Sequence, residues 1–401
     1  MRRVPLDHPS IDGAVLLRDV RGPSGDVLAR AGLRLTARSA RALREHGVAV
    51  AFIEDAVSAG LEVQPLIDLP GADAALARTL RDTCQIALRD VAPLLQQSTS
   101  RSVVMLRDVR FVQAMDASGT MERLRMAIHD LVDRIRDADP ASGFLTERPP
   151  GDDLYGHSVG VAALAVRLGA ELGFSHGDLA WTGLAAITHD LGLLMVPDEV
   201  RRTPAALRTP GQQRRYEDHT ILGEALLRPL DRRGPAFPVV AAEHHEEQSG
   251  GGYPRGLTGG NRVLRSSNAT GSGAPRMALV SEIVAVADRY ERLVSGAPGE
   301  APVSAAIARH IVAHEAGAKL NAEVVARFVD LVPRYPIGSE VVLHGGAYEG
   351  ARAVIVEQGE ERDRPIVRVY ETPEGAVIPT DMSLADEPVV SLAPVDALIA
   401  A

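Results

Sequence analysis

The spacing of apolar positions changes along the chain, and each change predicts a different kind of structure. Residues 13–54 hold short apolar runs typical of strands, together with a helix that Thr36 caps and Gly47 ends. From residue 72 to residue 136, apolar residues recur three and four positions apart, which predicts amphipathic helices. The sequence therefore predicts a small α/β unit, followed by helices that join it to the rest of the chain.

The second half of the chain has two further patterns of apolar and polar positions. Residues 150–330 are rich in alanine and leucine at helical spacing, and they predict six long helical segments: 154–172, 178–192, 212–230, 238–248, 277–294 and 304–315. Between the fourth and fifth segments, residues 258–275 are rich in Gly, Ser and Asn and predict a surface insertion. Residues 336–401 return to short β-type runs between glycine, proline and charged turns, which predicts a small β domain.

These patterns predict a multidomain α+β protein with an all-helical centre. The predicted parts are an N-terminal accessory α/β domain, a helical linker, a central helical domain and a C-terminal small β domain, over residues 1–65, 66–140, 141–332 and 333–401. A linker helix with an apolar stripe often packs against a second copy of itself. A homodimer through the helical linker is therefore one hypothesis.

Composition narrows the functional classes. The chain has 401 residues, 45% apolar and 24% charged, and a net charge of -10, which disfavours a general DNA binder or a protein held on an anionic membrane. No apolar run reaches the roughly 18 residues of a spanning helix. Cys84 is the only cysteine, so a disulfide framework and a cysteine zinc site are both excluded. We expect a cytoplasmic protein.

Histidines and aspartates recur once or twice in each of five successive predicted helical segments. These seven residues are His157, His189, Asp190, His219, His244, His245 and Asp288. Imidazole suits Fe, Mn, Zn and similar ions, and carboxylates can bridge two of them. Because seven donors exceed one four-ligand site, the pattern predicts at least two ions. A single helical histidine is more often a surface or core residue, but the adjacent pairs "HD" and "HH" argue against that alternative for the set.

Four motifs at these positions resemble the HD-GYP family of HD-superfamily phosphohydrolases, whose members hydrolyse cyclic di-GMP. They are "HDLG" at 189–192, "EDHTILG" at 217–223, "HHE" followed by "GYP" at 252–254, and "AVADRYE" around Asp288. The resemblance covers roughly residues 145–330 and implies an HD-type helical domain in the centre of the chain.

The resemblance also implies roles for individual residues. The family's metal ligands fall on the seven histidines and aspartates, with His189 and Asp190 as the catalytic pair and Asp190 as the bridging carboxylate. Two divalent ions, Fe or Mn, are implied, and Asp153 leaves open a third. Gly252, Tyr253 and Pro254 correspond to a loop over the substrate.

The chain departs from the family where substrate is gripped. Four positions differ: Leu193 stands for a lysine, Glu247 for an arginine, Ser249 for an aspartate and Ala297 for an arginine. Each charged donor to a phosphoryl oxygen in a dry site is worth roughly 100- to 1000-fold in rate. The chain has a single lysine, Lys319, and its other basic residues are arginines. Arginine would therefore be the conservative replacement for the family's lysine, but the chain has the uncharged Leu193 there. The arginines considered as substitutes for the missing charge are Arg201, Arg202 and Arg262.

Two functions follow from the intact ligand set and the altered contacts. The first is a metal-dependent phosphodiesterase, in which a hydroxide bridging the two ions attacks the phosphorus of cyclic di-GMP or a related cyclic dinucleotide. The second is a catalytically silent, metal-bound relative that senses a nucleotide or docks a protein partner in bacterial signalling. Leu193 and Ala297 favour the second function.

Overall fold

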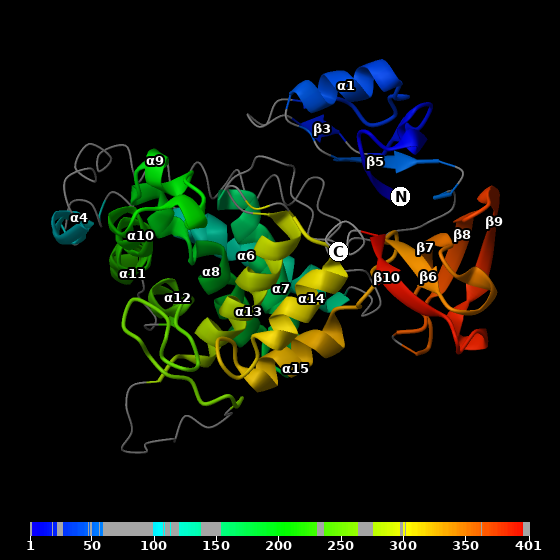
Figure 1. Cartoon of the computed structure of the whole chain (residues 1–401). Coiled ribbons are helices and arrows are strands. Elements are labelled where there is room, and N and C mark those ends of the chain that lie inside the picture. The colour runs from blue at the N-terminus through cyan, green and yellow to red at the C-terminus, as the bar shows by residue number, and fades with distance from the viewer. Residues whose placement is uncertain are drawn as a thin grey trace.

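The computed structural model of the chain combines a mainly helical centre with small strands near the N-terminus and a five-stranded sheet near the C-terminus (Figure 1). The structure describes residues 2–17, 19–21, 27–46, 48, 50–55, 57–58, 99–106, 108, 113, 120–137, 154–230, 236–263, 276–296, 300, 302–361 and 363–395. None of the helices within these ranges is both long and apolar enough to cross a lipid bilayer. The helix expected over 74–95 and most of the insertion over 258–275 lie outside the described residues.

The N-terminal elements match the predicted mixture of strands and one helix. They are β1 (Arg2–Pro5), η1 (Pro9–Ile11), β2 (Val15–Leu16), β3 (Val20–Arg21), β4 (Val27–Ala29), α1 (Ala37–Glu45) and β5 (Val50–Glu54). Antiparallel pairing gives the order β1-β5-β2, with β3 and β4 as a separate pair. Thr36 caps α1 by accepting a hydrogen bond from the backbone of Ser39, as the sequence predicts. These elements share one apolar cluster.

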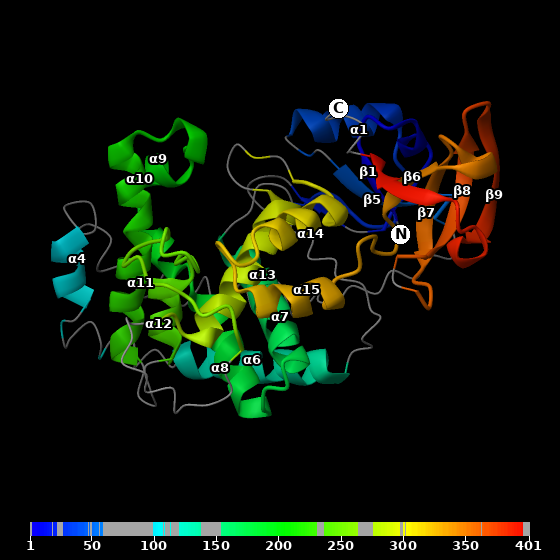
Figure 2. The ribbon, with the colours of Figure 1, turned by 60° about the horizontal axis from the view of Figure 1, so that its bottom comes forward.

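The middle of the chain is helical, and its helices lie to the left of the two groups of strands in Figures 1 and 2. They are α4 (Thr99–Leu106), α6 (Thr120–Asp137), α7 (Leu154–Glu171), α8 (His176–Thr188), η2 (Leu191–Met195), α9 (Asp198–Arg201), η3 (Ala205–Leu207), α10 (Pro210–Glu217), α11 (His219–Leu227), η4 (Arg228–Leu230), α12 (Ala236–Glu243), α13 (Leu279–Ser295), α14 (Ala305–His314) and α15 (Ala322–Leu331). The apolar stripe of α6 belongs to the same core as α7 and α8.

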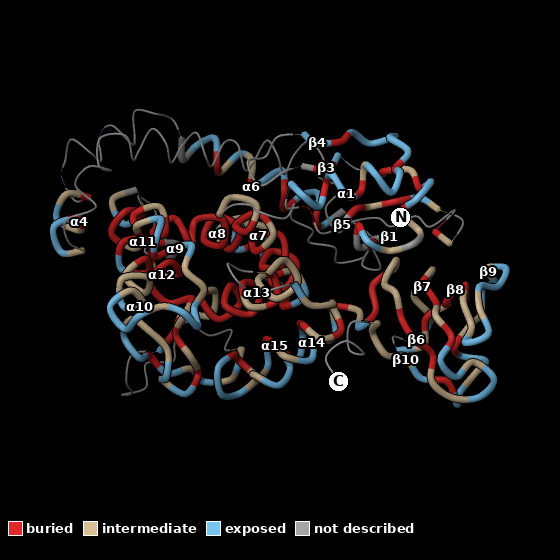
Figure 3. Tube along the Cα trace, turned by 45° about the horizontal axis from the view of Figure 1, so that its top comes forward, coloured by how far each residue is buried: buried red, intermediate tan, exposed pale blue. Residues whose placement is uncertain are grey.

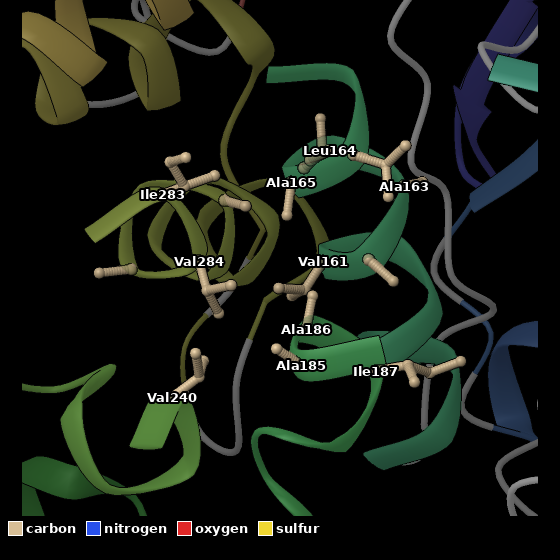
Figure 4. Packing of buried hydrophobic residues seen from close by; sticks show 14 of the residues in the cluster. Val161, Ala163, Leu164, Ala165, Ala185, Ala186, Ile187, Val240, Ile283 and Val284 are labelled. Carbon is tan, nitrogen blue, oxygen red and sulfur yellow. The ribbon is translucent and has the colours of Figure 1, made fainter. Parts of the chain in front are cut away.

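The core of this helical centre is built around α7. This helix is apolar on nearly all sides, and most of its residues are buried, as expected for a helix surrounded by others (Figure 3). Its neighbours α8 and α13 contribute small and branched side chains such as Ala186 and Val284, and Val240 of α12 belongs to the same core (Figure 4). Small side chains let the helices approach closely, and the polar residues at their ends are thereby brought toward one another.

The structure corrects three predicted helix boundaries. The segment predicted over 178–192 ends as α8 at Thr188, and the short 3-10 helix η2 follows it. The sequence predicts one helix over 212–230, but a turn at Asp218 separates α10 from α11, so His219 is the first residue of a new helix. Likewise the segment expected to be helical over 238–248 ends at Glu243, because the chain turns back through the glycines that follow. Polar residues thus stand at helix ends more often than the sequence indicates.

Gly192 allows η2 to lie directly against α11. A Cβ atom at this position would stand 1.9 Å from the carbonyl oxygen of His219 and 2.7 Å from the backbone nitrogen of Gly223. Both atoms belong to backbone, which cannot rotate away as a flexible side chain can. The close approach also fixes Asp190 beside His219, since the two residues flank this contact.

A five-stranded antiparallel sheet follows the helices. Its strands are β6 (Glu340–His344), β7 (Arg352–Glu357), β8 (Ile366–Thr372), β9 (Gly375–Ser383) and β10 (Ser391–Pro394), in the order β10-β6-β7-β8-β9, with η5 (Gly346–Tyr348) and η6 (Leu384–Asp386) in the connections. Four of these strands correspond to the predicted β-type runs; β10 adds to the edge of β6. The sheet has its own apolar cluster.

The contact at Gly192 generates a stability prediction. Gly192→Ala should lower the free energy of unfolding by about 1–3 kcal/mol, because the added methyl overlaps backbone of α11. Gly211→Ala is the matched control, since a Cβ there meets nothing within 4 Å, and alanine in α10 should be neutral or stabilising by up to about 1 kcal/mol. Guanidinium unfolding followed by circular dichroism measures both variants. Equal midpoints for the two would contradict the close approach.

Candidate metal centre

Seven polar side chains converge where α7, α8, α11, α12 and α13 meet. His157 lies in α7, His189 caps the C-terminus of α8 and Asp190 follows it, His219 begins α11, His244 and His245 follow α12, and Asp288 lies in α13. The seven are those singled out in the sequence. Their assignment as metal ligands stays a prediction, whereas their convergence is a feature of the structure.

The seven side chains divide into two groups that share one residue. Asp190, His219, His244 and His245 offer ligand atoms that all lie within 4.8 Å of one another, and so do His157, His189, Asp190 and Asp288. Only His245 among them is partly exposed. Two clusters of imidazole and carboxylate donors around a common carboxylate are compatible with the binding of divalent metal ions.

The first group, which we call the His219–His244–His245 position, gathers around one oxygen of Asp190. The Nε2 atoms of His219 and His244 each lie 3.3 Å from Asp190 Oδ1. The same two nitrogens are 3.3 Å apart. The ring of His245 stands beside them, with its centre 4.2 Å from that of His244.

The second group, which we call the His157–His189–Asp288 position, gathers around the other oxygen of Asp190. His157 Nε2 and His189 Nε2 lie 3.5 Å and 3.6 Å from Asp190 Oδ2. The same nitrogens lie 2.9 Å and 3.5 Å from Asp288 Oδ1. Asp190 therefore presents one carboxylate oxygen to each position.

Backbone carbonyls fix the orientation of three of the imidazoles. The Nδ1 atoms of His189, His219 and His244 lie 2.6 Å, 2.7 Å and 3.1 Å from carbonyl oxygens of the preceding turn. A carbonyl only accepts, so each Nδ1 carries a hydrogen, and in the neutral ring the lone pair is then on Nε2. This is the arrangement in which a histidine binds metal through Nε2.

A carboxylate takes the corresponding role for His157. Its Nδ1 lies 2.5 Å from Glu291 Oε2, and Glu291 is fully buried. The other oxygen of Glu291 accepts a hydrogen bond from Ser295 at 2.8 Å. Sequence reasoning missed Glu291, although its place three residues after Asp288 puts both on the same face of α13 and was a usable signal.

Several atoms at the centre of these groups lack the partners that buried polar atoms usually have. In the part of the chain that the structure describes, His157 Nε2, His189 Nε2, His245 Nε2 and Asp190 Oδ1 are buried without a hydrogen-bond partner. Because an unsatisfied buried polar atom costs about 1–3 kcal/mol, a cluster of them aimed at common points fits bound cations.

The two carboxylates are held in the charged form that binds metal. Burial opposes ionisation of Asp190, but the neighbouring His189 and Arg292 outweigh it and hold the pKa of Asp190 well below its usual range. Burial also opposes ionisation of Asp288, whose pKa is likewise held well below its usual range by Arg292 and by His157 and His189.

Two histidines are shifted in opposite directions. Burial, together with His244 and His219, lowers the pKa of His245 well below its usual range, so this ring is neutral and able to bind an ion. Burial and Arg292 also lower the pKa of His157, but Glu291 and the neighbouring aspartates outweigh them and raise it to about 9.

A basic residue that the sequence reasoning missed lies against the ligand set. Arg292 Nη2 is 2.5 Å from Asp190 Oδ2, and its Nε is 2.8 Å from Asp288 Oδ1. The arginines considered from the sequence lie elsewhere: Arg201 pairs with Asp198, Arg202 is largely exposed, and Arg262 is exposed. The signal for Arg292 was its position one helical turn after Asp288.

The "GYP" segment folds back against the histidine pair. The backbone nitrogen of Tyr253 donates to the carbonyl oxygen of His245 at 3.1 Å, and the two rings lie 4.8 Å apart. A Cβ at Gly252 would stand 2.4 Å from backbone atoms of His245 and Glu247, so only glycine fits there. Glu246 holds the following turn by accepting from the backbones of Arg255 and Leu257.

Residues that depart from the family pattern have diverse surroundings. Leu193 is buried in a small apolar cluster with Val196 and Val200. Glu247 is partly buried and Ser249 is exposed. Ala297 and Asp153, the residue considered for a third ion, lie outside the described residues.

Known proteins are similar to this chain over a range that includes its central helices. The family model for the HD domain matches residues 154–293. The cyclic di-GMP phosphodiesterase of Pseudomonas aeruginosa is 29% identical over 71% of this chain and 63% of its own length. A cyclic di-GMP phosphodiesterase of Thermotoga maritima is 30% identical over 45% of each chain. A solved structure of an HDG"Y"P protein from Bdellovibrio bacteriovorus covers 82% of this chain and 98% of its own, at 14% identity and a TM-score of 0.40.

The matched region contains all seven converging residues and the "GYP" segment. The chain spans less than two thirds of the length of either relative. Residues 154–293 thus match the HD domain, and the motifs at the converging residues are similar to those of the HD-GYP family within it.

Proposed function

We propose that this chain is a metal-dependent phosphodiesterase that hydrolyses cyclic di-GMP or a related cyclic dinucleotide. The observation that carries the proposal is the sharing of Asp190 between two groups of buried imidazole and carboxylate donors. Paired divalent ions bridged by a carboxylate are suited to phosphoryl transfer, because they stabilise charge on both the entering and the leaving oxygen.

The proposed ligands are the seven converging residues, with His189 and Asp190 as the pair on which activity depends most. Fe and Mn suit this set, since both accept imidazole and carboxylate. Bound ions would supply an activated water and Lewis acidity toward the phosphoryl group. The protein's part would be to orient the rings of His189, His219 and His244, whose Nδ1 atoms contact backbone carbonyls, so that each Nε2 is directed inward.

Substrate would enter beside Tyr253. Its ring lies against His245, the one partly exposed residue of the seven, so this side is the open side of the centre. Gly252 lets the loop approach the backbone at the end of α12, and we assign Gly252, Tyr253 and Pro254 to the wall over the substrate. A base face could stack on the exposed part of Tyr253.

A second function is supported by one observation. Leu193 is buried among apolar side chains where the family carries a lysine, so this position offers no charge to a phosphate. A chain that retains the metal ligands and has lost substrate contacts would bind a nucleotide or a signalling partner without turnover. Cyclic di-GMP binding and hydrolysis measured on one metal-loaded sample separate the two functions, because a silent relative binds and does not hydrolyse.

We assign the remaining parts of the chain to accessory roles. Residues 1–65 and 333–401 would be separate small domains beside the HD-type centre, consistent with their own apolar clusters. A homodimer through the linker of residues 66–140 would use surfaces other than the stripe of α6 that is buried in the central core. Action in the cytoplasm, where cyclic dinucleotides signal, is part of the same proposal.

Substitution of the shared carboxylate tests the metal centre. Asp190→Ala should abolish most metal binding at both positions, measured by elemental analysis of anaerobically purified protein. Hydrolysis of cyclic di-GMP with added Mn or Fe(II) should fall more than about 100-fold, the upper end of the loss seen when only an outer partner of a ligand is removed. The matched control is Asp198→Ala, whose side chain is exposed on α9.

The native protein should carry about two ions per chain, as the two ligand groups imply. Full metal content and unchanged turnover in Asp190→Ala would contradict the proposal. Two ions with no turnover of any cyclic dinucleotide would favour the silent relative.

The partner of His157 provides a second test. Glu291→Ala should weaken metal binding by about 10- to 100-fold, because His157 loses the group that orients its ring. Glu291→Gln keeps an acceptor for Nδ1 of His157 and should therefore lose less metal affinity than Glu291→Ala. Metal titration of the stripped protein measures both. If Glu291→Ala binds metal as tightly as the native chain, the carboxylate does not position His157.

A further inference from the structure

Arg292 joins the two carboxylates of the candidate metal centre. It stands one turn after Asp288 on α13, with Nε 2.8 Å from Asp288 Oδ1 and Nη2 2.5 Å from Asp190 Oδ2. Its side chain is 23% exposed, so the guanidinium reaches inward from the surface. One cation of this chain thus already bridges two of the proposed ligands.

The two oxygens that Arg292 contacts belong to one metal position only. Asp190 Oδ2 and Asp288 Oδ1 are the oxygens that face His157 and His189, at 2.9–3.6 Å. By contrast Asp190 Oδ1, which faces His219 and His244, has no hydrogen-bond partner within the described residues. Arg292 therefore contacts the carboxylate oxygens of the His157–His189–Asp288 position and not the Asp190 oxygen that faces His219 and His244.

A divalent ion at the His157–His189–Asp288 position needs the same oxygens. Carboxylate–guanidinium bonds are charge-assisted and strong, and their directions compete with those of metal coordination. The ion must displace Arg292 or share the carboxylates with a nearby positive charge, and either costs affinity. The Arg292 side chain is partly exposed, whereas both carboxylates that it contacts are buried.

We propose that Arg292 is a tethered cation that competes with metal for the His157–His189–Asp288 position, so that the His219–His244–His245 position fills first. This inference rests on the metal binding proposed above and adds an order of loading to it. The two positions are then unequal, and the second is occupied only at higher concentrations of metal.

Titration of the metal-stripped, full-length protein with Mn²⁺, followed by the electron paramagnetic resonance signal of free Mn²⁺, tests the inference. The native chain should show two classes of site whose dissociation constants differ at least about tenfold, the smallest effect expected from displacing two charge-assisted bonds. Arg292→Gln should tighten the weaker class at least about tenfold and leave the tighter class unchanged.

Two further variants make the titration specific. Arg289→Gln is the control, because Arg289 lies on the same helix but pairs with Glu315 away from the centre. Arg292→Lys keeps a charge but cannot contact both carboxylates as the guanidinium does. The dissociation constant of its weaker class should therefore lie between the values for the native chain and for Arg292→Gln. His245→Ala should remove the tighter class and His189→Ala the weaker one.

Three results would overturn the inference. Two equal classes in the native chain, unchanged by Arg292→Gln, would show that Arg292 does not compete, and the metal proposal would stand. Weaker binding at both positions in Arg292→Gln would make Arg292 a support for the carboxylates instead. No Mn²⁺ binding in any variant would remove both the inference and the metal proposal on which it rests.

Discussion

The carboxylate of Asp190 lies between two sets of imidazoles and faces each set with one oxygen. The arrangement of the central helices brings the two sets to this carboxylate. Asp190 is fully buried, and a charged carboxylate in such a place needs compensation from every side. The histidines come from the ends of helices that the apolar core packs together, and Gly192 brings α11 close enough for His219 to reach the same point. The positions of the buried polar residues therefore depend on how the apolar core packs the helices together.

Much of this centre could be predicted from the sequence. The seven polar residues were recognisable because paired motifs stand among alanine- and leucine-rich segments, where a polar residue needs a reason to be buried. Helix types and the C-terminal strands followed from periodicity and turn residues. The break at Asp218 did not follow, because no glycine or proline interrupts the predicted helix there.

The division of the seven residues into two groups also lay beyond the sequence, since it depends on which carboxylate oxygen faces which ring. Arg292 was missed for a similar reason. An arginine one turn after an aspartate is typical of an exposed helix face, and only the fold shows that this one reaches two buried carboxylates. The chain has no charge at Leu193, where the family pattern has a lysine, and the charge of Arg292 is directed at Asp190 and Asp288.

Diffraction from crystals loaded with Mn²⁺ at saturating concentration would test the central claim most directly, through the anomalous signal of the metal. The account predicts two peaks about 3.5–4 Å apart, one on each side of Asp190, with its two oxygens directed at different ions. A single peak, or two peaks that do not share Asp190, would contradict it.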